Sequence, residues 1–581
     1  MKADTHSLDA TVEQELSAWV RRAFGRAFPG ADLAALAPDA VPTADEAHGD
    51  YQCNAAMAAA KLLKQKPRDV AAAAIAAAEP HPAVERAEIA GPGFINLRLR
   101  PEWLARRLEA AQADPRLGVP AAGAGLTVVL DYSSPNVAKP MHVGHIRSTV
   151  IGTALDRLHR FLGWRVIADN HLGDWGTQFG ILILGYRHLV DEQALAEDPV
   201  QELERVYVQS YERSEQDAAW KDRARAELVK LQQGDPENRA LWKRFVDLSL
   251  AEFGAVYRRL GVSFDLVRGE SWYNDRLPGV VARLERLGLA RASEGATVVM
   301  LEDEQLPVCI VRKSDGAFNY ATTDLATIES RMEEFRPDAI VYVTDERQQL
   351  HFKQIFAIAR KAGAAARLVH VWFGLMRLPE GTFSTRQGNV IKLQKLLDEA
   401  EARALELVRQ TSPQMPPEQQ RAVARAVGLG AVKYADLSQN PQSLVTFTWD
   451  KALALEGNSA PYLQYACARI ASVQDKYAER FPGGRPEDHP LALAEPLERR
   501  LALRLARFPD VLLKAASAFR PNVLADYLFD LAQTYSAFYQ NVPFLKAEAG
   551  VRESRVRLCA LTARTLRQGL HLLGIETPER I

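Results

Sequence analysis

The sequence predicts an α/β protein with three parts: a small α/β domain, a domain built on a parallel sheet, and an all-α bundle. Three observations lead to this prediction. Strand-like apolar runs alternate with helical patterns between Leu126 and about Lys395, which is the rhythm of a parallel sheet. After about Leu396 the strand-like runs disappear. The chain, at 581 residues, is also too long for a single hydrophobic core.

Residues 1–115 form the first predicted domain. They are rich in alanine and mostly helical in pattern. They end in the turn Gly91-Pro92-Gly93, which leads into an alternating strand over residues 94–99. Taken alone, this segment indicates only a small α/β domain.

Residues 116–395 form the second predicted domain. A long helix is expected over residues 146–161. The strands of this domain are expected at the apolar runs 126–130, 165–168, 339–343 and 368–373. Between about residues 189 and 291 the pattern becomes charged and helical, which predicts an insertion. Because ligands bind at the carboxyl ends of parallel strands, we expect the functional residues there.

Residues 396–448 are predicted to form a helical connector, and residues 449–581 a helical bundle. In the bundle, Leu528, Leu531, Tyr535 and Phe538 are spaced along one helix face. Residues 499–581 contain 13 Lys and Arg but only 7 Asp and Glu, although the whole chain has a formal net charge of −1. A basic end suits a polyanionic partner, but a solvated helix face rich in arginine would give the same count.

The composition argues against several classes of protein. No apolar run approaches the length of a membrane span, and the charged N-terminus lacks the apolar core of a signal peptide. The four cysteines, Cys53, Cys309, Cys467 and Cys559, are too far apart for a CxxC zinc site. We therefore expect a cytoplasmic protein with no membrane partner and no structural zinc.

Residues 133–148 are the most informative part of the chain. They connect the strand at 126–130 to the helix at 146–161, and a strand-to-helix turn can receive a phosphate. Gly144 lies between His142 and His145, and a glycine lets a flat ring approach the backbone. Two alternatives remain for His-x-x-His alone: surface histidines, or a metal site, although the spacing of a zincin helix is absent.

The twelve residues 134–145, Ser-Pro-Asn-Val-Ala-Lys-Pro-Met-His-Val-Gly-His, resemble the HIGH signature of class I aminoacyl-tRNA synthetases, in the form used by arginyl-tRNA synthetases. Other segments resemble motifs of the same family, in the family's order, so that the resemblance spans residues 48–581. They are residues 47–51 and 90–99, 169–178, 320–326, 348–351, 381–393, 456–470 and 561–575, the last with Ala560 where the DALR aspartate would stand.

The resemblance implies a Rossmann-like parallel-sheet catalytic domain, an N-terminal domain that contacts the outer corner of the tRNA, and a C-terminal anticodon-binding bundle. It implies an arginine–tRNA ligase, which activates L-arginine with ATP and Mg²⁺ and transfers it to the terminal 2′-OH of tRNA-Arg. In this family activation itself requires tRNA. We expect the same here, in an enzyme that is a monomer.

The catalytic and ATP-binding residues follow from the HIGH motif and from residues 381–393, which resemble the KMSK loop of class I enzymes. Thr382 and Gln387 stand at the two usual lysine positions of that loop. We therefore hypothesise that Lys139 supplies the missing cation, with help from Arg386. The expected set is His142, Gly144, His145, Lys139, Ser384, Thr385 and Arg386.

A guanidinium group is a planar fork of donors, which carboxylates and neutral acceptors bind best. By resemblance to the family's Y-x-T-x-D-L-A and Q-x-x-H motifs, Asp324 would bind this group, with Tyr320 and Gln348 beside it. Asp131 and Asn136 would hold the α-amino and carboxylate end of the amino acid. His171 and Asp174, in the D-x-G-x-Q segment, are further candidates for contacts with ribose or amino acid.

In the helical end, unpaired anticodon bases would be read by aromatic stacking and by hydrogen bonds. The candidates are Tyr462, Tyr465, Arg469 and Tyr539, of which at least half could equally be core residues. Two alternatives to the ligase remain: a non-catalytic regulator that binds RNA or arginine, and a cysteinyl-type synthetase. The second would need a zinc thiolate site, for which the chain offers no cysteine cluster.

Overall fold

A computed structural model describes residues 8–31, 36, 38–378, 381–382 and 392–581. The chain folds into two compact units. One unit combines Met1–Ala122 with Leu455–His571 and Thr577–Ile581, and the other combines Gly123–Ala454 with Leu572–Glu576.

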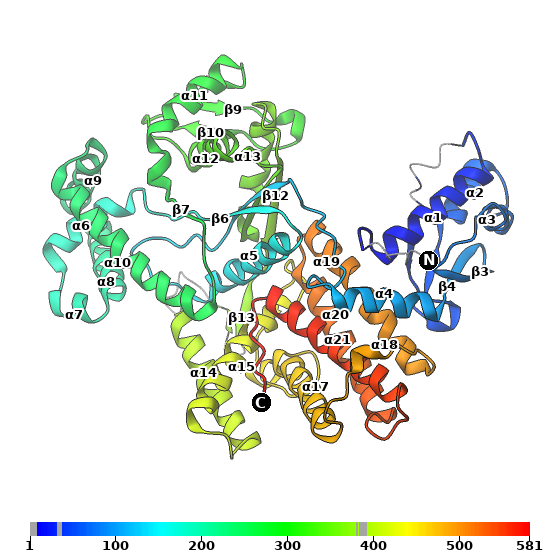
Figure 1. Ribbon diagram of the computed structural model, residues 1–581. Helices are drawn as coiled ribbons and strands as arrows, with labels where there is room; N and C mark the ends of the chain where they lie inside the picture. Colours follow the sequence, from blue (N-terminus) through cyan, green and yellow to red (C-terminus); the bar gives the residue numbers. More distant parts are fainter. Residues whose placement is uncertain (1–7, 32–35, 37, 379–380, 383–391) are drawn as a thin grey trace. The chain divides into compact units, whose positions relative to one another are not determined.

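A five-stranded parallel sheet forms the centre of the second unit (Figure 1). Its strands, in spatial order, are β12 (Arg367–Phe373), β11 (Ala339–Asp345), β5 (Thr127–Asp131), β6 (Arg165–Asn170) and β7 (Leu266–Val267). The four strands predicted from apolar runs are confirmed. The central residues of β5, β6 and β11 are buried on both faces of the sheet, as is usual for parallel strands, whereas β12 at the edge is only partly buried.

The order of the strands creates a switch point between β5 and β11. From β5 the chain passes through α5 (Val143–Phe161) to β6 and then β7, and it later returns to the other side of β5 as β11. In open parallel sheets, ligands bind in the crevice beyond the carboxyl ends of the strands at such a point. The residues that follow β5 and β11 are therefore placed to face one crevice.

Helices cover the sheet. A shared apolar core joins the sheet to α11 (Leu277–Arg286), α12 (Tyr320–Phe335) and α13 (Gln349–Lys361), and to a small antiparallel sheet. That small sheet consists of β8 (Ala290–Ser293), β9 (Ala296–Val299) and β10 (Cys309–Arg312). The helix α5 contacts β5, β6 and β11 directly.

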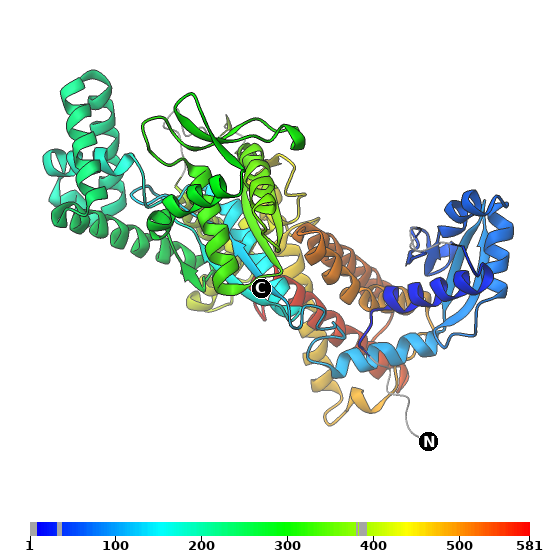
Figure 2. The same ribbon diagram turned by 90° about the horizontal axis from the view of Figure 1, so that it is seen from above.

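The predicted insertion is a bundle of its own in Figures 1 and 2, but its helices have other bounds than the sequence pattern suggested. They are α6 (Gln178–Leu189), α7 (Glu192–Glu197), α8 (Pro199–Gln216), α9 (Ala218–Gln233) and α10 (Pro236–Leu260). Thus α6 already packs with α8 and α9, and the long helices end at residue 260, not near residue 291. Gly261, at φ 62°, terminates α10, and the chain re-enters the sheet as β7.

Two long helices follow the catalytic sheet: α14 (Leu393–Thr411) and α15 (Pro417–Leu437). Strand structure does not end with them as expected, because the short β15 (Val445–Thr446) pairs with β13 (Met376–Leu378), which also pairs with β14 (Gly381–Thr382). The short helix α16 (Trp449–Ala452) follows. A buried ion pair between Arg147 and Asp436, 2.8 Å apart, ties α5 to α15.

The other unit contains a four-stranded antiparallel sheet in the order β1 (Ala40–Pro42), β2 (Tyr51–Cys53), β4 (Phe94–Leu99), β3 (Val84–Ala90). Its helices are α1 (Val12–Ala27), α2 (Ala55–Leu63), α3 (Pro67–Ala76) and α4 (Pro101–Ala113). The predicted bundle is present as α17 (Ala460–Arg480), α18 (Pro496–Ala506), α19 (Phe508–Ser517), α20 (Pro521–Asn541) and α21 (Val551–Leu572).

Several arginines of the basic end form ion pairs inside this unit. Arg499 binds Asp50 of the N-terminal domain at 2.6 Å, and Arg555 binds Glu498 at 2.7 Å with both side chains buried. Part of the excess positive charge read from the sequence therefore holds the two domains of the unit together.

Candidate active site

The residues after β5 form a tight turn, which we call the HIGH turn (residues 133–145). Ser133, Ser134 and Ala138 all have φ between 47° and 73°, a region that L residues rarely adopt. Such backbone strain persists where the surrounding structure imposes it, and it concentrates at functional sites.

The two histidines of the HIGH turn are held by backbone hydrogen bonds. His142 caps α5, and its Nδ1 accepts the amide of Gly144 at 3.0 Å. The Nδ1 of His145 accepts the amide of His142 at 3.1 Å. Because each Nδ1 accepts a hydrogen bond, a neutral ring must carry its proton on Nε2. Both imidazoles are thus fixed as Nε2–H donors.

Both rings are also kept neutral. Burial, together with the neighbouring imidazole of His142, lowers the pKa of His145 to about 3. Burial lowers the pKa of His142 as well, with further contributions from Arg347 and Lys139. The glycine between the rings is required by packing, because a Cβ on Gly144 would lie 2.7 Å from Cε1 of His142. In the structure, the ring that lies against Gly144 is therefore that of His142.

Lys139 is exposed in the HIGH turn. Its Nζ lies 5.2 Å from the ring centroid of Tyr207, which belongs to α8 of the insertion. Its charge is close enough to His142 to lower the pKa of that imidazole. The cation expected from the sequence is therefore next to the HIGH histidines.

A cavity of about 340 Å³ opens beside this turn. All five residues predicted to bind the amino acid line it, from three separate parts of the chain. Its lining is Asp131, Ser134, Asn136, His171, Gly173, Glu270, Tyr320, Asp324, Tyr342, Thr344, Gln348, His351 and Phe352.

Three carboxyl groups line the cavity, and they differ in their partners. Asp324 accepts a hydrogen bond from Nε2 of His351 at 2.6 Å. Asp131 is already neutralised, because its Oδ2 lies 2.6 Å from the buried Arg331 and its Oδ1 accepts from Ser134. Glu270 forms no ion pair with the described residues, and burial together with Asp324 raises its pKa to about 8.

Glu270 and Arg331 were not found from the sequence. Glu270 lies in the 3₁₀ turn Glu270–Arg276, and this turn is held by Asp174. The two carboxylate oxygens of Asp174 accept the amide and the hydroxyl of Ser271, at 2.8 and 2.6 Å. Asp174, expected as a possible substrate contact, instead fixes the turn that carries Glu270. His171 does line the cavity, as expected of a contact residue.

The KMSK-like loop can be placed only at its ends. Ser384, Thr385, Arg386 and Gln387 lie outside the described residues. Where the description resumes, the backbone of Lys392 pairs with that of His142, and the amide of Leu393 donates to Met141 at 2.9 Å. The loop therefore ends directly against the HIGH turn.

In the helical bundle, three of the four candidate tRNA contacts come together. The guanidinium of Arg469 lies 4.8 Å from the ring centroid of Tyr465 and 5.6 Å from that of Tyr539. Tyr465 is exposed. The fourth, Tyr462, packs edge-on against Phe529, as a core tyrosine would.

Within the described ranges, no group of three or more His, Cys, Asp or Glu side chains could hold a metal ion. The four cysteines are buried and unbridged, and burial raises the pKa of each thiol, to about 11 for Cys53 and Cys309. No helix in that same part of the chain is both long and apolar enough to cross a membrane.

Comparison with known proteins gives one consistent result. Residues 108–449 match the catalytic domain of class I (R) tRNA synthetases, residues 463–581 the DALR anticodon-binding domain, and residues 9–99 the N-terminal domain of arginyl-tRNA synthetases. The chain is 44% identical to an arginine–tRNA ligase of Hahella chejuensis, over 99% of this chain and 100% of that protein. It is 47% identical to the one of Azotobacter vinelandii, over 93% and 94%.

Solved structures agree with these sequence matches. The arginyl-tRNA synthetase of Thermus thermophilus is similar with a TM-score of 0.84 and 26% identity, covering 98% of this chain and 100% of that one. Similarity thus extends over both units and not only over the parallel sheet.

Proposed function

The chain belongs to the arginyl-tRNA synthetase family, and we propose that it activates L-arginine with ATP and then transfers the arginyl group to the 3′-terminal adenosine of tRNA-Arg. As a member of this family it is an enzyme, an arginine–tRNA ligase. The observation that carries the proposal is an acidic cavity lined by Ser134 and Asn136 of the HIGH turn, the same turn that fixes two imidazoles as hydrogen-bond donors. ATP enters as its complex with Mg²⁺.

In the activation step, a carboxylate oxygen of arginine attacks the α-phosphorus of ATP. A new P–O bond forms, and the bond to the bridging oxygen breaks, so that pyrophosphate leaves with the electron pair. We propose that the Nε2–H groups of His142 and His145 donate to the phosphate oxygens as negative charge develops on them. Because both rings are neutral and preorganised, they need no proton transfer and no reorientation.

We propose that Lys139 supplies the positive charge that the altered loop lacks, assisted by Arg386 and with Ser384 and Thr385 contacting ATP. Support comes from the position of Lys139, exposed and close to His142. The test is Lys139→Ala. We expect the activation rate to fall about 100-fold, the size of effect seen when a preorganised donor to developing charge is lost. A rate within twofold of the wild type would show that Lys139 has no such role.

For arginine, we propose that Asp324 and Glu270 bind the guanidinium group, with Tyr320 and Gln348 at its edge. Asn136, beside Asp131, would hold the α-amino end near the HIGH turn. Asp131 would act mainly through its neighbours, because Arg331 and Ser134 already occupy its two oxygens. A lysine competitor lacks the planar fork and would leave buried acceptors unpaired.

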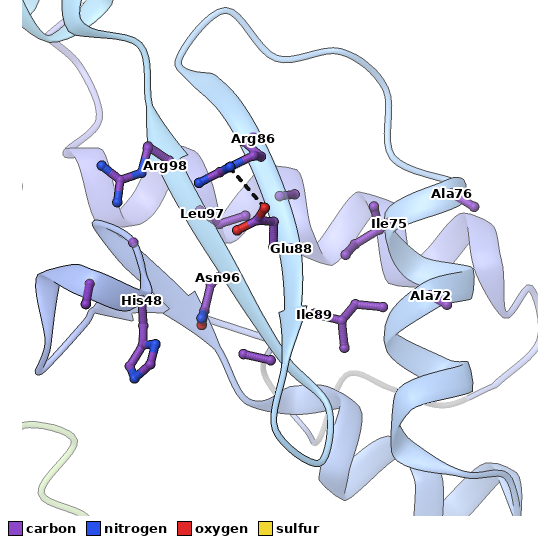
Figure 3. Close-up of a pocket in the computed structure, with 14 residues that line it drawn as sticks. His48, Ala72, Ile75, Ala76, Arg86, Glu88, Ile89, Asn96, Leu97 and Arg98 are labelled. Carbon is purple, nitrogen blue, oxygen red and sulfur yellow. Dashed lines mark ion pairs between the residues drawn. The ribbon is translucent and has the colours of Figure 1, made fainter.

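For tRNA, we propose two contact regions in the first unit. One is the group of Arg469 with Tyr465 and Tyr539, as a platform on which anticodon bases stack, with Tyr462 packed one turn earlier in the same helix. The other is a hollow of about 740 Å³ on the N-terminal sheet. Figure 3 shows it with His48 and Arg98 at one side, Ile75 and Ile89 at the other, and Asn96 between them.

The hollow has the chemistry of a nucleobase site. Its apolar wall could stack a base. The Oδ1 of Asn96, which is buried, has no hydrogen-bond partner among the residues described. An orphaned buried acceptor costs free energy unless a ligand satisfies it. Asn96→Ala should therefore weaken tRNA binding, while arginine binding in the other unit stays unchanged.

We further propose that activation requires tRNA, and that the enzyme acts as a monomer in the cytoplasm. ATP–pyrophosphate exchange with and without tRNA-Arg tests the first point. Robust arginine-dependent exchange without tRNA would contradict it. A complete absence of exchange under both conditions would favour the non-catalytic alternative, a regulator that binds arginine or RNA.

A further inference from the structure

The residues that follow β11 contain a cation, Arg347, at the same edge of the sheet as the HIGH turn. Arg347 lies in the 3₁₀ turn Glu346–Gln348, directly after β11. β11 pairs with β5 as far as Tyr342, which lies opposite Asp131, and then continues along β12 for three more residues to Asp345. The chain after β5 leads to His142, and the chain after β11 leads to Arg347. Both segments thus border the crevice at the switch point.

A direct contact fixes how close these two segments are. Ser148 in α5 donates its hydroxyl to the carbonyl of Val343 at 2.6 Å. Ser148 lies three residues after His145, on the same face of α5. Val343 precedes Arg347 by only four residues. The second turn of α5 therefore lies against the last residues of β11.

The side chain of Arg347 is held in one orientation, but part of its guanidinium group remains available to a ligand. Its Nε and Nη2 donate to the two oxygens of Asp345, at 2.7 and 3.0 Å, and its amide also donates to Asp345 at 2.8 Å. The side chain is nevertheless 73% exposed. No described residue accepts a hydrogen bond from Nη1. A guanidinium fixed on one edge by a carboxylate can still bind a phosphate with its other edge.

The electrostatics agree with this placement. Among the charged neighbours that lower the pKa of His142, Arg347 contributes more than Lys139. The next residue, Gln348, lines the amino-acid cavity. Arg347 therefore lies near enough to His142 to act on it electrostatically, and it directly precedes a residue that lines the amino-acid cavity.

Resting on the proposed function, we propose that Arg347 binds the β- and γ-phosphates of ATP and the pyrophosphate that leaves, with Asp345 as its positioning residue. As the bond from the α-phosphorus to the bridging oxygen breaks, the electron pair moves to pyrophosphate. A guanidinium fixed beside that group stabilises the growing charge without moving. This second cation compensates for the lysines missing at Thr382 and Gln387.

The test compares Arg347→Ala and Arg347→Lys with a matched control, Arg360→Ala. Arg360 lies near the far end of α13, which begins two residues after Arg347, so it is about 18 Å away by helix rise. It is also exposed, at 54%, and also faces one carboxylate, that of Glu304. We expect Arg347→Ala to lower kcat/KM for ATP about 100-fold, Arg347→Lys to be intermediate, and Arg360→Ala to stay within twofold.

Inhibition by pyrophosphate and by AMP shows which phosphates of ATP Arg347 contacts. If Arg347 holds the leaving phosphates, Arg347→Ala should weaken inhibition by pyrophosphate at least tenfold and leave inhibition by AMP and the KM for arginine within twofold. Weakened inhibition by AMP with unchanged inhibition by pyrophosphate would overturn the proposal, as would unchanged kinetics. If Arg347→Ala lowers the melting temperature, the same comparison is made with Arg347→Gln, with the same criteria.

The outcome also separates this inference from the proposed function. A wild type that charges tRNA-Arg while Arg347→Ala matches it in every constant would refute only the role of Arg347. A wild type that forms no arginyl-tRNA would refute both.

Discussion

Glu270 gives the strongest prediction, because its ionisation should be coupled to arginine binding. Burial and the nearby Asp324 raise its pKa to about 8, so at pH 7 it is mostly protonated in the free enzyme. A bound guanidinium stays charged and favours the carboxylate form, which lowers the pKa of Glu270. Arginine binding should therefore release a proton, and affinity should rise with pH up to about 8.

The magnitude follows from the pKa. At pH 7 about one molecule in eleven carries ionised Glu270, so ionisation costs about 1.4 kcal/mol of binding free energy. Between pH 6 and pH 8 the ionised fraction rises about 50-fold, which sets the largest increase in affinity that this group can give. Glu270→Gln cannot ionise and should lose that increase.

Isothermal titration calorimetry measures both quantities. Titrations of arginine at pH 7 in two buffers with different ionisation enthalpies should show about 0.9 proton released by the wild type and about none by Glu270→Gln. Glu304→Gln, an exposed carboxylate outside the cavity, is the control and should behave like the wild type. Equal proton release by the wild type and Glu270→Gln, or proton uptake on binding, would refute the reasoning.

Three further predictions concern packing and buried charge. Gly173→Ala would place a Cβ 2.0 Å from Oδ1 of Asn136, so we expect the KM for arginine to rise about tenfold in steady-state charging, by displacement of one cavity contact. Arg331→Met leaves the carboxylates of Asp131 and Asp169 buried without their partner, and should lower the free energy of unfolding by about 3–5 kcal/mol in denaturant titrations. Burial raises the pKa of Asp510 to about 7, so Asp510 binds a proton more tightly in the folded protein than in the unfolded chain. The free energy of unfolding of the wild type therefore falls as the pH rises from about 4 to about 7. Asp510→Asn should accordingly melt at a higher temperature than the wild type at pH 8 but not at pH 4; equal shifts at both pH values would count against this explanation.

The sequence predicted those parts of the fold that have a recognisable pattern within a short stretch of residues. The strands at 126–130 and 339–343 are apolar runs of the length of a strand, and α5 has both a cap residue and an apolar period. By contrast, β7 and β15 have two residues each, too few to leave a pattern, and their pairing depends on strands far away in the sequence. The helical insertion ended early because of a single glycine at positive φ.

The same limit applies to the site. Residues within motifs, such as Asp324 and Gln348, were placed in the cavity as predicted. The buried ion pairs of Arg331 were not predicted, because its partners Asp131 and Asp169 lie 200 and 162 residues away in the sequence. A helical pattern does not show that one of its arginines is buried. Glu270 reaches the cavity only through the contact of Ser271 with Asp174, across 97 residues. Long-range ion pairs and turns of this kind become visible only in three dimensions.

The acidic cavity selects the amino acid that is transferred to tRNA, and we expect that amino acid to be arginine. The most direct test is a charging assay with tRNA-Arg, ATP and Mg²⁺, in which arginine is compared with citrulline, a neutral analogue of nearly the same shape. We predict arginyl-tRNA formation by the wild type and discrimination against citrulline by at least about 10³-fold, since citrulline would leave the carboxyls of Asp324 and Glu270 without a cation. Equal charging with both, or no arginyl-tRNA at all, would contradict the account.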